Sequence, residues 1–128
     1  MTTSSEALKA FRDSGAKYLD LRFTDVKGKW QHLTMDGTVV DEDLLNNGVF
    51  FDGSSIAGWK AINESDMVLK PDLSTTVMDP FTAQPTMMIF CNILDAVTKE
   101  PYERDPRGTA KKAEEYVKSS GIGDSVYI

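Results

Sequence analysis

The side chains best suited to chemistry gather in the stretch V-F-F-D-G-S-S-I-A-G-W-K-A-I-N-E-S-D at 49–66. Within seven positions of it lie one carboxylate, two hydroxyls and two glycines, at Asp52, Gly53, Ser54, Ser55 and Gly58. No apolar periodicity runs through the stretch, which predicts a loop of about fifteen residues. Loops of that length in compact domains usually present groups to a ligand or a neighbour. The alternative is a connection whose Asp52 only caps its own turn.

Other polar and sulfur-bearing side chains are assigned structural roles. His32 is the single histidine and lies on a predicted strand, which favours a surface or cross-strand role over a metal ligand or general base. The acidic trio 41–43 lies in the first turn of a predicted short helix, where carboxylates usually serve the helix terminus and not a metal site. Cys91 follows Ile89 and Phe90, as expected of a small buried hydrophobe, and a single cysteine excludes an intramolecular disulfide.

The composition is that of a folded domain with an acidic balance. Of the 128 residues, 41% are hydrophobic and 27% charged, which excludes a disordered chain. The net charge of −6, from 20 acidic and 14 basic residues, argues against a nucleic-acid partner. The first residues lack the pattern of a signal peptide, and no apolar run approaches the ~20 residues of a membrane span. We therefore expect a soluble, cytoplasmic protein with no membrane partner.

Hydrophobic periodicity and capping residues predict an alternation of strands and helices. Strands are expected at 17–24, 29–35, 66–70, 86–94 and, as a brief edge strand, at 75–78. The first two are joined by a short glycine-containing turn and predict a β-hairpin. Strand 86–94 is apolar on both faces except at Asn92, which predicts a strand with both faces buried, either central to its sheet or under another layer. Helices are expected at 4–14, 41–47 and 105–120, the last with Asp105 as its N-cap and Pro106 in its first turn.

The chain is expected to contain more than one unit. Helix 105–120 follows a charged connector with Pro101, outside the first sheet, and 125–128 predicts the start of another strand. We therefore predict a first domain at 1–103 and the opening of a second, truncated domain at 104–128.

Five segments occur in a fixed order across nearly the whole chain. They are L-R-F-T-D at 21–25 with Gly28, F-D-G-S-S-I-A-G-W at 51–59, N-E-S-D-M at 63–67, M-D-P-F at 78–81 and R-D-P-R at 104–107. Together they resemble the N-terminal part of bacterial glutamine synthetase of type I. The resemblance implies an α+β fold, a β-grasp-like curved mixed sheet with a packed helix, followed by the first helix and strand of a catalytic domain.

The same resemblance implies an activity and an assembly. Enzymes of this family join glutamate and ammonia with ATP and Mg²⁺ or Mn²⁺, through a γ-glutamyl phosphate. Identical subunits form two stacked hexameric rings, with each active site between neighbours. The metal and ATP ligands belong to the catalytic domain, so the resemblance implies that this chain alone binds neither and is inactive.

Four residues acquire roles from the resemblance. Asp52 corresponds to the ammonium-site aspartate, Ser55 to a hydroxyl lining that pocket, and Asp66 to an aspartate near the flap that closes over the substrates. Trp59 is expected at a subunit contact. The alternative function is a free-standing β-grasp interaction module without catalysis.

Overall fold

The computed structural model describes residues 2–56, 58 and 66–125. The α-helices are α1 Ser4–Asp13, α2 Glu42–Asn47 and α3 Pro106–Ser119. The strands are β1 Tyr18–Thr24, β2 Trp30–Asp36, β3 Val49–Asp52, β4 Asp66–Pro71, β5 Val77–Met78 and β6 Thr86–Asp95. Short 3-10 turns follow three of the strands, namely η1 Gly37–Val39, η2 Gly53–Ser55 and η4 Leu73–Thr75.

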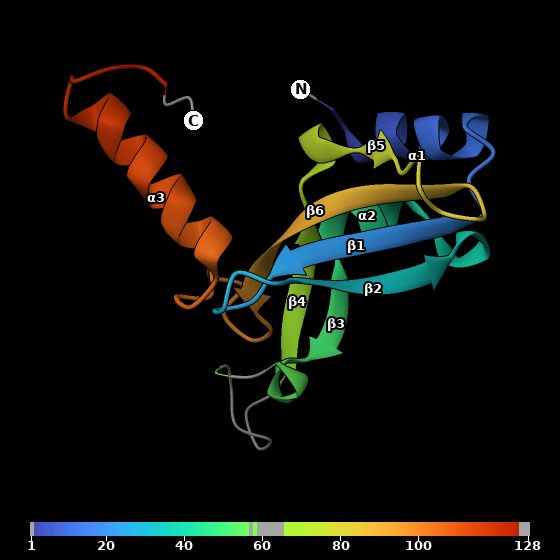
Figure 1. Ribbon diagram of the computed structural model, residues 1–128, viewed down its shortest axis with the longest axis horizontal. Coiled ribbons are helices and arrows are strands. Elements are labelled where there is room, and N and C mark those ends of the chain that lie inside the picture. Colours follow the sequence, from blue (N-terminus) through green and yellow to red (C-terminus); the bar gives the residue numbers. More distant parts are fainter. Residues whose placement is uncertain (1, 57, 59–65, 126–128) are drawn as a thin grey trace.

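The strands form one curled mixed sheet (Figure 1). Their order is β2-β1-β6-β4-β3, and β5 pairs with the beginning of β6. The pairing of β1 with β6 is parallel, while the other pairs are antiparallel. The predicted hairpin of β1 and β2 is confirmed, and of the two places predicted for strand 86–94, β6 occupies the centre of the sheet.

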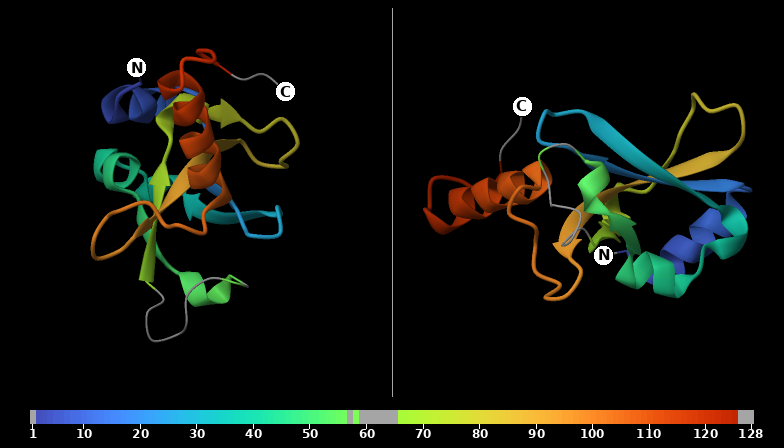
Figure 2. Two further views of the ribbon diagram at one scale, coloured as in Figure 1. Left: turned by 90° about the vertical axis from the view of Figure 1, so that its left-hand side faces the viewer. Right: turned by 90° about the horizontal axis from the view of Figure 1, so that it is seen from below.

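The core lies between this sheet and the two N-terminal helices. Leu19, Leu21 and Phe23 of β1 point into it, as their alternation predicts, and are almost fully buried. Figure 2 shows α1 and α2 side by side on this face of the sheet, and both contribute to the same buried cluster. Cys91 is part of that cluster, and burial raises the pKa of its thiol to about 12, so the predicted role as an inert hydrophobe is confirmed.

Local capping explains where the helices begin and end. Thr3 caps α1, and its hydroxyl and the Glu6 side chain form a reciprocal capping box. Asp41 caps α2 by accepting a hydrogen bond from the Leu44 N–H at 2.8 Å. Gly48 ends α2 with φ +84°, and a Cβ there would collide with the backbone of β4. Only glycine allows the chain to turn from α2 into β3 this close to its neighbour.

Two sequence predictions were wrong in part. The stretch predicted as a loop from residue 49 begins instead as strand β3, where Val49 and Phe51 are half-buried and Phe50 is exposed. Strand β6 buries only one face completely, while alternate residues on the other face remain half-buried. Ser125 belongs to no strand, and 126–128 lie outside the described residues.

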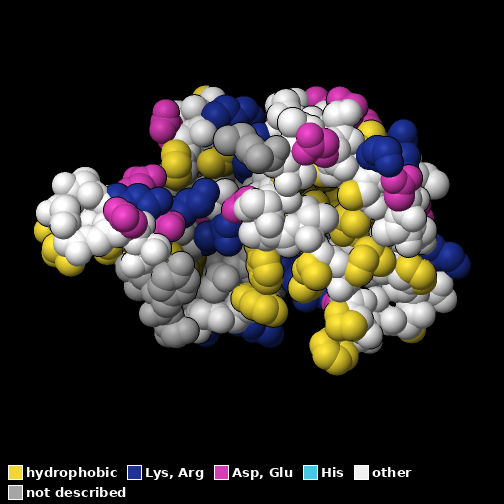
Figure 3. Space-filling model, turned by 90° about the horizontal axis from the view of Figure 1, so that it is seen from above, with side chains coloured by type: hydrophobic (Ala, Val, Ile, Leu, Met, Phe, Trp, Pro, Cys, Tyr) yellow, Lys and Arg dark blue, Asp and Glu magenta, His cyan; other side chains and the backbone are white. Residues whose placement is uncertain are grey.

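The C-terminal helix α3 projects from the body of the domain (Figure 1). Its N-cap is Asp105, with Pro106 in the first turn, as predicted. None of its residues is buried, and in Figure 3 it carries cationic and anionic side chains close together. The predicted domain boundary between residues 103 and 104 stays a prediction.

The segment before α3 closes an edge of β6 that β1 does not reach. Pairing with β1 extends along β6 to Phe90. Beyond it, the Ile93 carbonyl accepts a hydrogen bond from the Tyr102 N–H at 2.9 Å, and the Ile93 N–H donates to the Asp105 carboxylate at 3.0 Å. The same carboxylate accepts from the Arg107 N–H at 3.1 Å. The Asp105 carboxylate therefore accepts hydrogen bonds both from a strand N–H group and from an N–H group at the start of a helix.

The Asp105 side chain is predicted to be a main determinant of stability. Replacing it with alanine removes an N-cap and leaves the Ile93 N–H buried without a partner, which should cost ~2–4 kcal/mol. Asparagine keeps one acceptor oxygen but replaces the other with an amide group that only donates, so Asp105→Asn should cost less than Asp105→Ala, ~1–2 kcal/mol. Urea denaturation measures both variants, and equal losses would contradict the hydrogen-bonding role.

Candidate functional site

Asp52 ends β3 and begins the 3-10 turn η2. Its Oδ1 accepts hydrogen bonds from the Ser54 N–H at 2.9 Å and the Ser54 hydroxyl at 2.6 Å. The Ile56 N–H then donates to the Gly53 carbonyl at 3.1 Å and closes the turn. The Asp52 side chain is thus oriented by its own turn while remaining exposed.

The structure places Asp66 directly opposite Asp52 on the neighbouring antiparallel strand. Opposed side chains in such a pair share one face, with Cβ atoms about 4.5–5.5 Å apart. Both residues are exposed. Two carboxylates placed in this way repel each other.

Asp52 and Ser55 line one cavity of about 230 Å³. The other lining residues are Phe23, Gln31, His32, Leu33, Phe51, Ile56 and Leu69. The rings of Phe23 and Phe51 pack with their centroids 5.4 Å apart. Because the sheet curls, this pair joins β1 to β3 across the intervening strands, and it fixes the residue immediately before Asp52.

The cap made by Asp52 is not unique in the chain. Asp36 accepts hydrogen bonds from the Thr38 N–H and hydroxyl, and Asp72 accepts from the same two groups of Ser74. The alternative interpretation of Asp52 as a turn cap is therefore confirmed as a description of its local geometry. Asp52 differs from Asp36 and Asp72 in facing a second carboxylate across a strand pair.

Trp59, which was predicted at a subunit contact, lies outside the described residues. In the part of the chain that the structure describes, no three histidine, cysteine, aspartate or glutamate side chains gather to hold a metal ion. The described residues therefore offer no donor set for the Mg²⁺ or Mn²⁺ that the resemblance assigns to the catalytic domain. None of the described helices has the length and apolar character needed to cross a membrane.

Residues 15–96 match the sequence profile of the family described as glutamine synthetase, β-grasp domain. The chain belongs to the glutamine synthetase family. The curled mixed sheet with packed helices is the β-grasp fold of that family, so the predicted fold class is confirmed.

Individual relatives agree with the family match. The chain is 66% identical over 128 residues to glutamine synthetase of Rhizobium meliloti (strain 1021) and 52% identical over 126 residues to that of Pseudomonas aeruginosa (strain PAO1). These matches cover 100% and 98% of the chain but only 27% of each relative.

Solved structures support the fold. Plasmodium falciparum glutamine synthetase superposes with a TM-score of 0.82 at 22% identity, covering 94% of this chain and 23% of that one. An ADP complex of GmaS gives a TM-score of 0.78 at 16% identity, covering 89% of this chain and 26% of that one.

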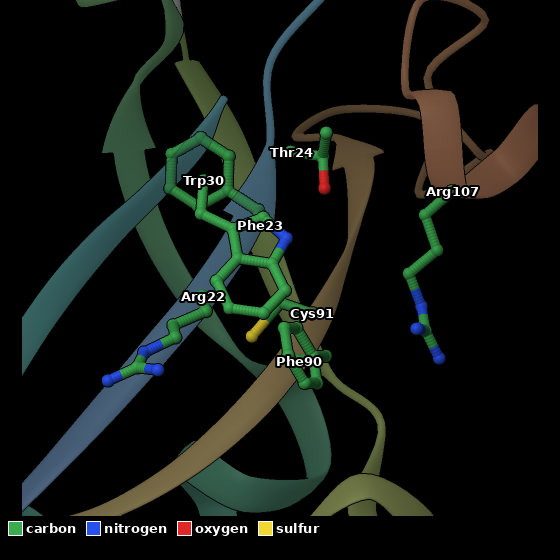
Figure 4. A pocket seen from close by; sticks show the side chains of 7 residues that line it. All are labelled: Arg22, Phe23, Thr24, Trp30, Phe90, Cys91 and Arg107. Atoms are coloured by element: carbon green, nitrogen blue, oxygen red, sulfur yellow. The ribbon is translucent and has the colours of Figure 1, made fainter. Parts of the chain in front are cut away.

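The glutamine synthetase β-grasp domain also contains a second cavity, of about 270 Å³, on the other face of β1. Figure 4 shows Trp30 beside Phe90 there, with their ring centroids 5.1 Å apart. Both arginines that line it are held by acidic or amide side chains. Arg22 donates to Asp79 at 2.5 Å and to Asp20 at 2.8 Å, and Arg107 donates to Asn92 and Asp72.

Asp20 is the centre of this polar cluster. It is almost fully buried and accepts hydrogen bonds from Arg22 and Thr34, while the His32 Nδ1 lies 2.7 Å from its Oδ1. Burial acts to raise the pKa of Asp20, but these hydrogen bonds outweigh it and hold the pKa below its ordinary value. The cross-strand role predicted for His32 is confirmed. The hydrogen bond from Arg22 to Asp79 was not predicted, because these two residues lie 57 positions apart in the sequence.

Acid should destabilise the domain through this cluster. Hydrogen bonds from the Phe81 N–H and Arg22 likewise lower the pKa of Asp79. Carboxylates with a lowered pKa stabilise the fold above the unfolded value of about 4, and this contribution is lost as the pH falls through the folded value. Asp105 has the opposite sign, because burial raises its pKa; its protonation on acidification favours the folded state.

We expect the urea midpoint to fall when the pH is lowered from 6 to 3. The pKa is lowered at Asp20, Asp25, Asp72 and Asp79, and the stability lost at these four carboxylates should exceed what Asp105 gains. Asp20→Asn should be less stable by ~1.5–3 kcal/mol at pH 6, since the asparagine cannot accept charge-assisted bonds. The difference between the two proteins should shrink as the pH is lowered from 6 to 3, because the stabilisation from the lowered pKa of Asp20 is lost as the pH falls. An equal difference at both pH values would contradict this role of Asp20.

Proposed function

We propose that this β-grasp domain is the N-terminal portion of an ATP-dependent glutamate–ammonia ligase and supplies the ammonium-site loop to a neighbouring subunit. The observation that carries the proposal is the register that sets Asp52 opposite Asp66, beside the cavity that Ser55 lines. Family membership and the 66% identity to a glutamine synthetase support the reaction class.

The carboxylate pair suits the recognition of ammonium. A compact cation gains attraction from both Asp52 and Asp66, whereas water and other neutral competitors do not. The Ser54 N–H and hydroxyl hold the Asp52 side chain in one orientation, so little ordering remains when the cation binds. The Ser55 hydroxyl can accept or donate a hydrogen bond within the same cavity.

Asp52 is also placed to take part in proton loss. Ammonium has no lone pair and becomes a nucleophile only when one N–H bond breaks and the proton moves to a base. The Asp52 carboxylate, in contact with the bound ammonium, can accept that proton and leave neutral ammonia with a free lone pair. ATP with Mg²⁺ or Mn²⁺ would supply the activation of the glutamate γ-carboxylate, at groups assigned to the catalytic domain.

The proposal requires identical subunits, in the cytoplasm, assembled as two stacked hexameric rings. Exposed large apolar side chains support an assembly, since such surfaces commonly mark protein contacts. They include Trp30, Phe50, Phe81, Tyr116 and Ile122. The 128-residue chain alone should show no ligase activity.

The test uses a hybrid enzyme in which this chain replaces the aligned residues of Rhizobium meliloti glutamine synthetase. In Asp52→Asn the site loses one negative charge, and the KM for ammonium should rise about ten- to a hundredfold. The KM for glutamate should change little, because glutamate makes no use of that charge. Steady-state kinetics with ammonium and glutamate varied separately measure both constants.

Asp36→Asn is the matched control. Asp36 is an exposed aspartate followed by glycine, and it caps a 3-10 turn through a hydroxyl residue in the same way as Asp52. It should leave both KM values unchanged. An unchanged KM for ammonium in Asp52→Asn would favour the interaction-module alternative.

A further inference from the structure

A hydrogen bond joins the functional loop to the segment that leads into α3. The Arg104 guanidinium donates from Nη1 to the Gly58 carbonyl at 2.7 Å, across 46 residues of sequence. Arg104 is exposed, and no core packing explains its position. Gly58 follows η2 closely along the chain, so the bond reaches the loop just after Asp52 and Ser55.

Gly58 is also confined from the side of the β1–β2 turn. Its φ is +86°, and a Cβ built on it would lie 2.9 Å from the Val26 Cγ2. A side chain at this position would be strained by the backbone angle and would press on Val26. The absence of a side chain therefore lets the loop backbone lie against the turn, while Arg104 holds its carbonyl.

Arg104 is suited to this task because its own backbone is fixed. The next residue, Asp105, is 2% exposed and binds the Ile93 N–H and the Arg107 N–H. The Asp105 N–H in turn donates to the Tyr102 carbonyl at 3.1 Å. These contacts tie the start of α3 to the central strand β6, so the guanidinium extends from a rigid base.

We propose that Arg104 is a positioning residue, which holds the Gly58 backbone so that the preceding Asp52 and Ser55 keep their places. Its consequence for ammonium binding rests on the function proposed above. The start of α3 and the loop are thereby coupled, because a shift of the helix terminus moves the group that holds Gly58. A single N–H donor makes the bond, so lysine can replace arginine while methionine, of similar length, cannot.

The first test uses the 128-residue protein and does not depend on catalysis. In Arg104→Met the exchange of the Ile56 amide hydrogen, which is bonded to the Gly53 carbonyl, should be about fivefold faster. Arg104→Lys should restore slow exchange. Arg12→Met removes an exposed arginine from the last turn of α1 and should leave the Ile56 amide unchanged. Equal exchange in Arg104→Met and the original protein would overturn the proposal.

The second test uses the hybrid enzyme. Arg104→Met should raise the KM for ammonium about fivefold with a smaller change in kcat, and Arg104→Lys should recover most of the loss. If Asp52→Asn raises this KM and Arg104→Met does not, the positioning role is overturned while the proposed function stands. If Arg104→Met speeds exchange and neither variant alters the KM, the positioning role is supported and the proposed ammonium site is contradicted.

Discussion

The N–H group of Ile93 imposes a constraint on which much of this structure depends. β6 is the central strand, and β1 pairs with it only as far as Phe90. A buried backbone donor without a partner costs about as much as a lost hydrogen bond, so the chain returns and supplies the Asp105 carboxylate. That return determines where α3 begins and places Arg104 next to the loop that contains Gly58. A satisfied backbone donor thus connects the core of the sheet to the candidate site.

A second constraint comes from the curl of the sheet. In strand order, β1 and β3 are separated by β6 and β4, yet Phe23 and Phe51 pack ring against ring. Burial of these two rings fixes β3 in position, and the β3–β4 register then sets the two carboxylates opposite each other. Apolar packing therefore offsets the electrostatic cost of holding Asp52 close to Asp66.

The sequence was informative wherever local chemistry decides the outcome. Alternation in β1 and β2 predicted the hairpin, and aspartate followed by proline predicted the start of α3. The interactions that were missed join residues distant in sequence, such as Arg22 with Asp79 and Arg104 with Gly58. Strand β3 was missed because it has four residues and one exposed phenylalanine, too short a run for periodicity to appear. Asp52 and Asp66 were selected by resemblance, but their opposition follows only from strand register.

The three capped turns show why local geometry cannot by itself assign a function to Asp52. Asp36, Asp52 and Asp72 each bind the N–H and hydroxyl of the residue two positions later. Their surroundings separate them, since Asp72 pairs with Arg107 whereas Asp52 faces another carboxylate. A second carboxylate across the strand pair adds to the negative potential at Asp52, and a cation bound there would be attracted by both charges. The same turn thus serves structure at one position and supports ligand recognition at another, and the neighbouring strand decides which.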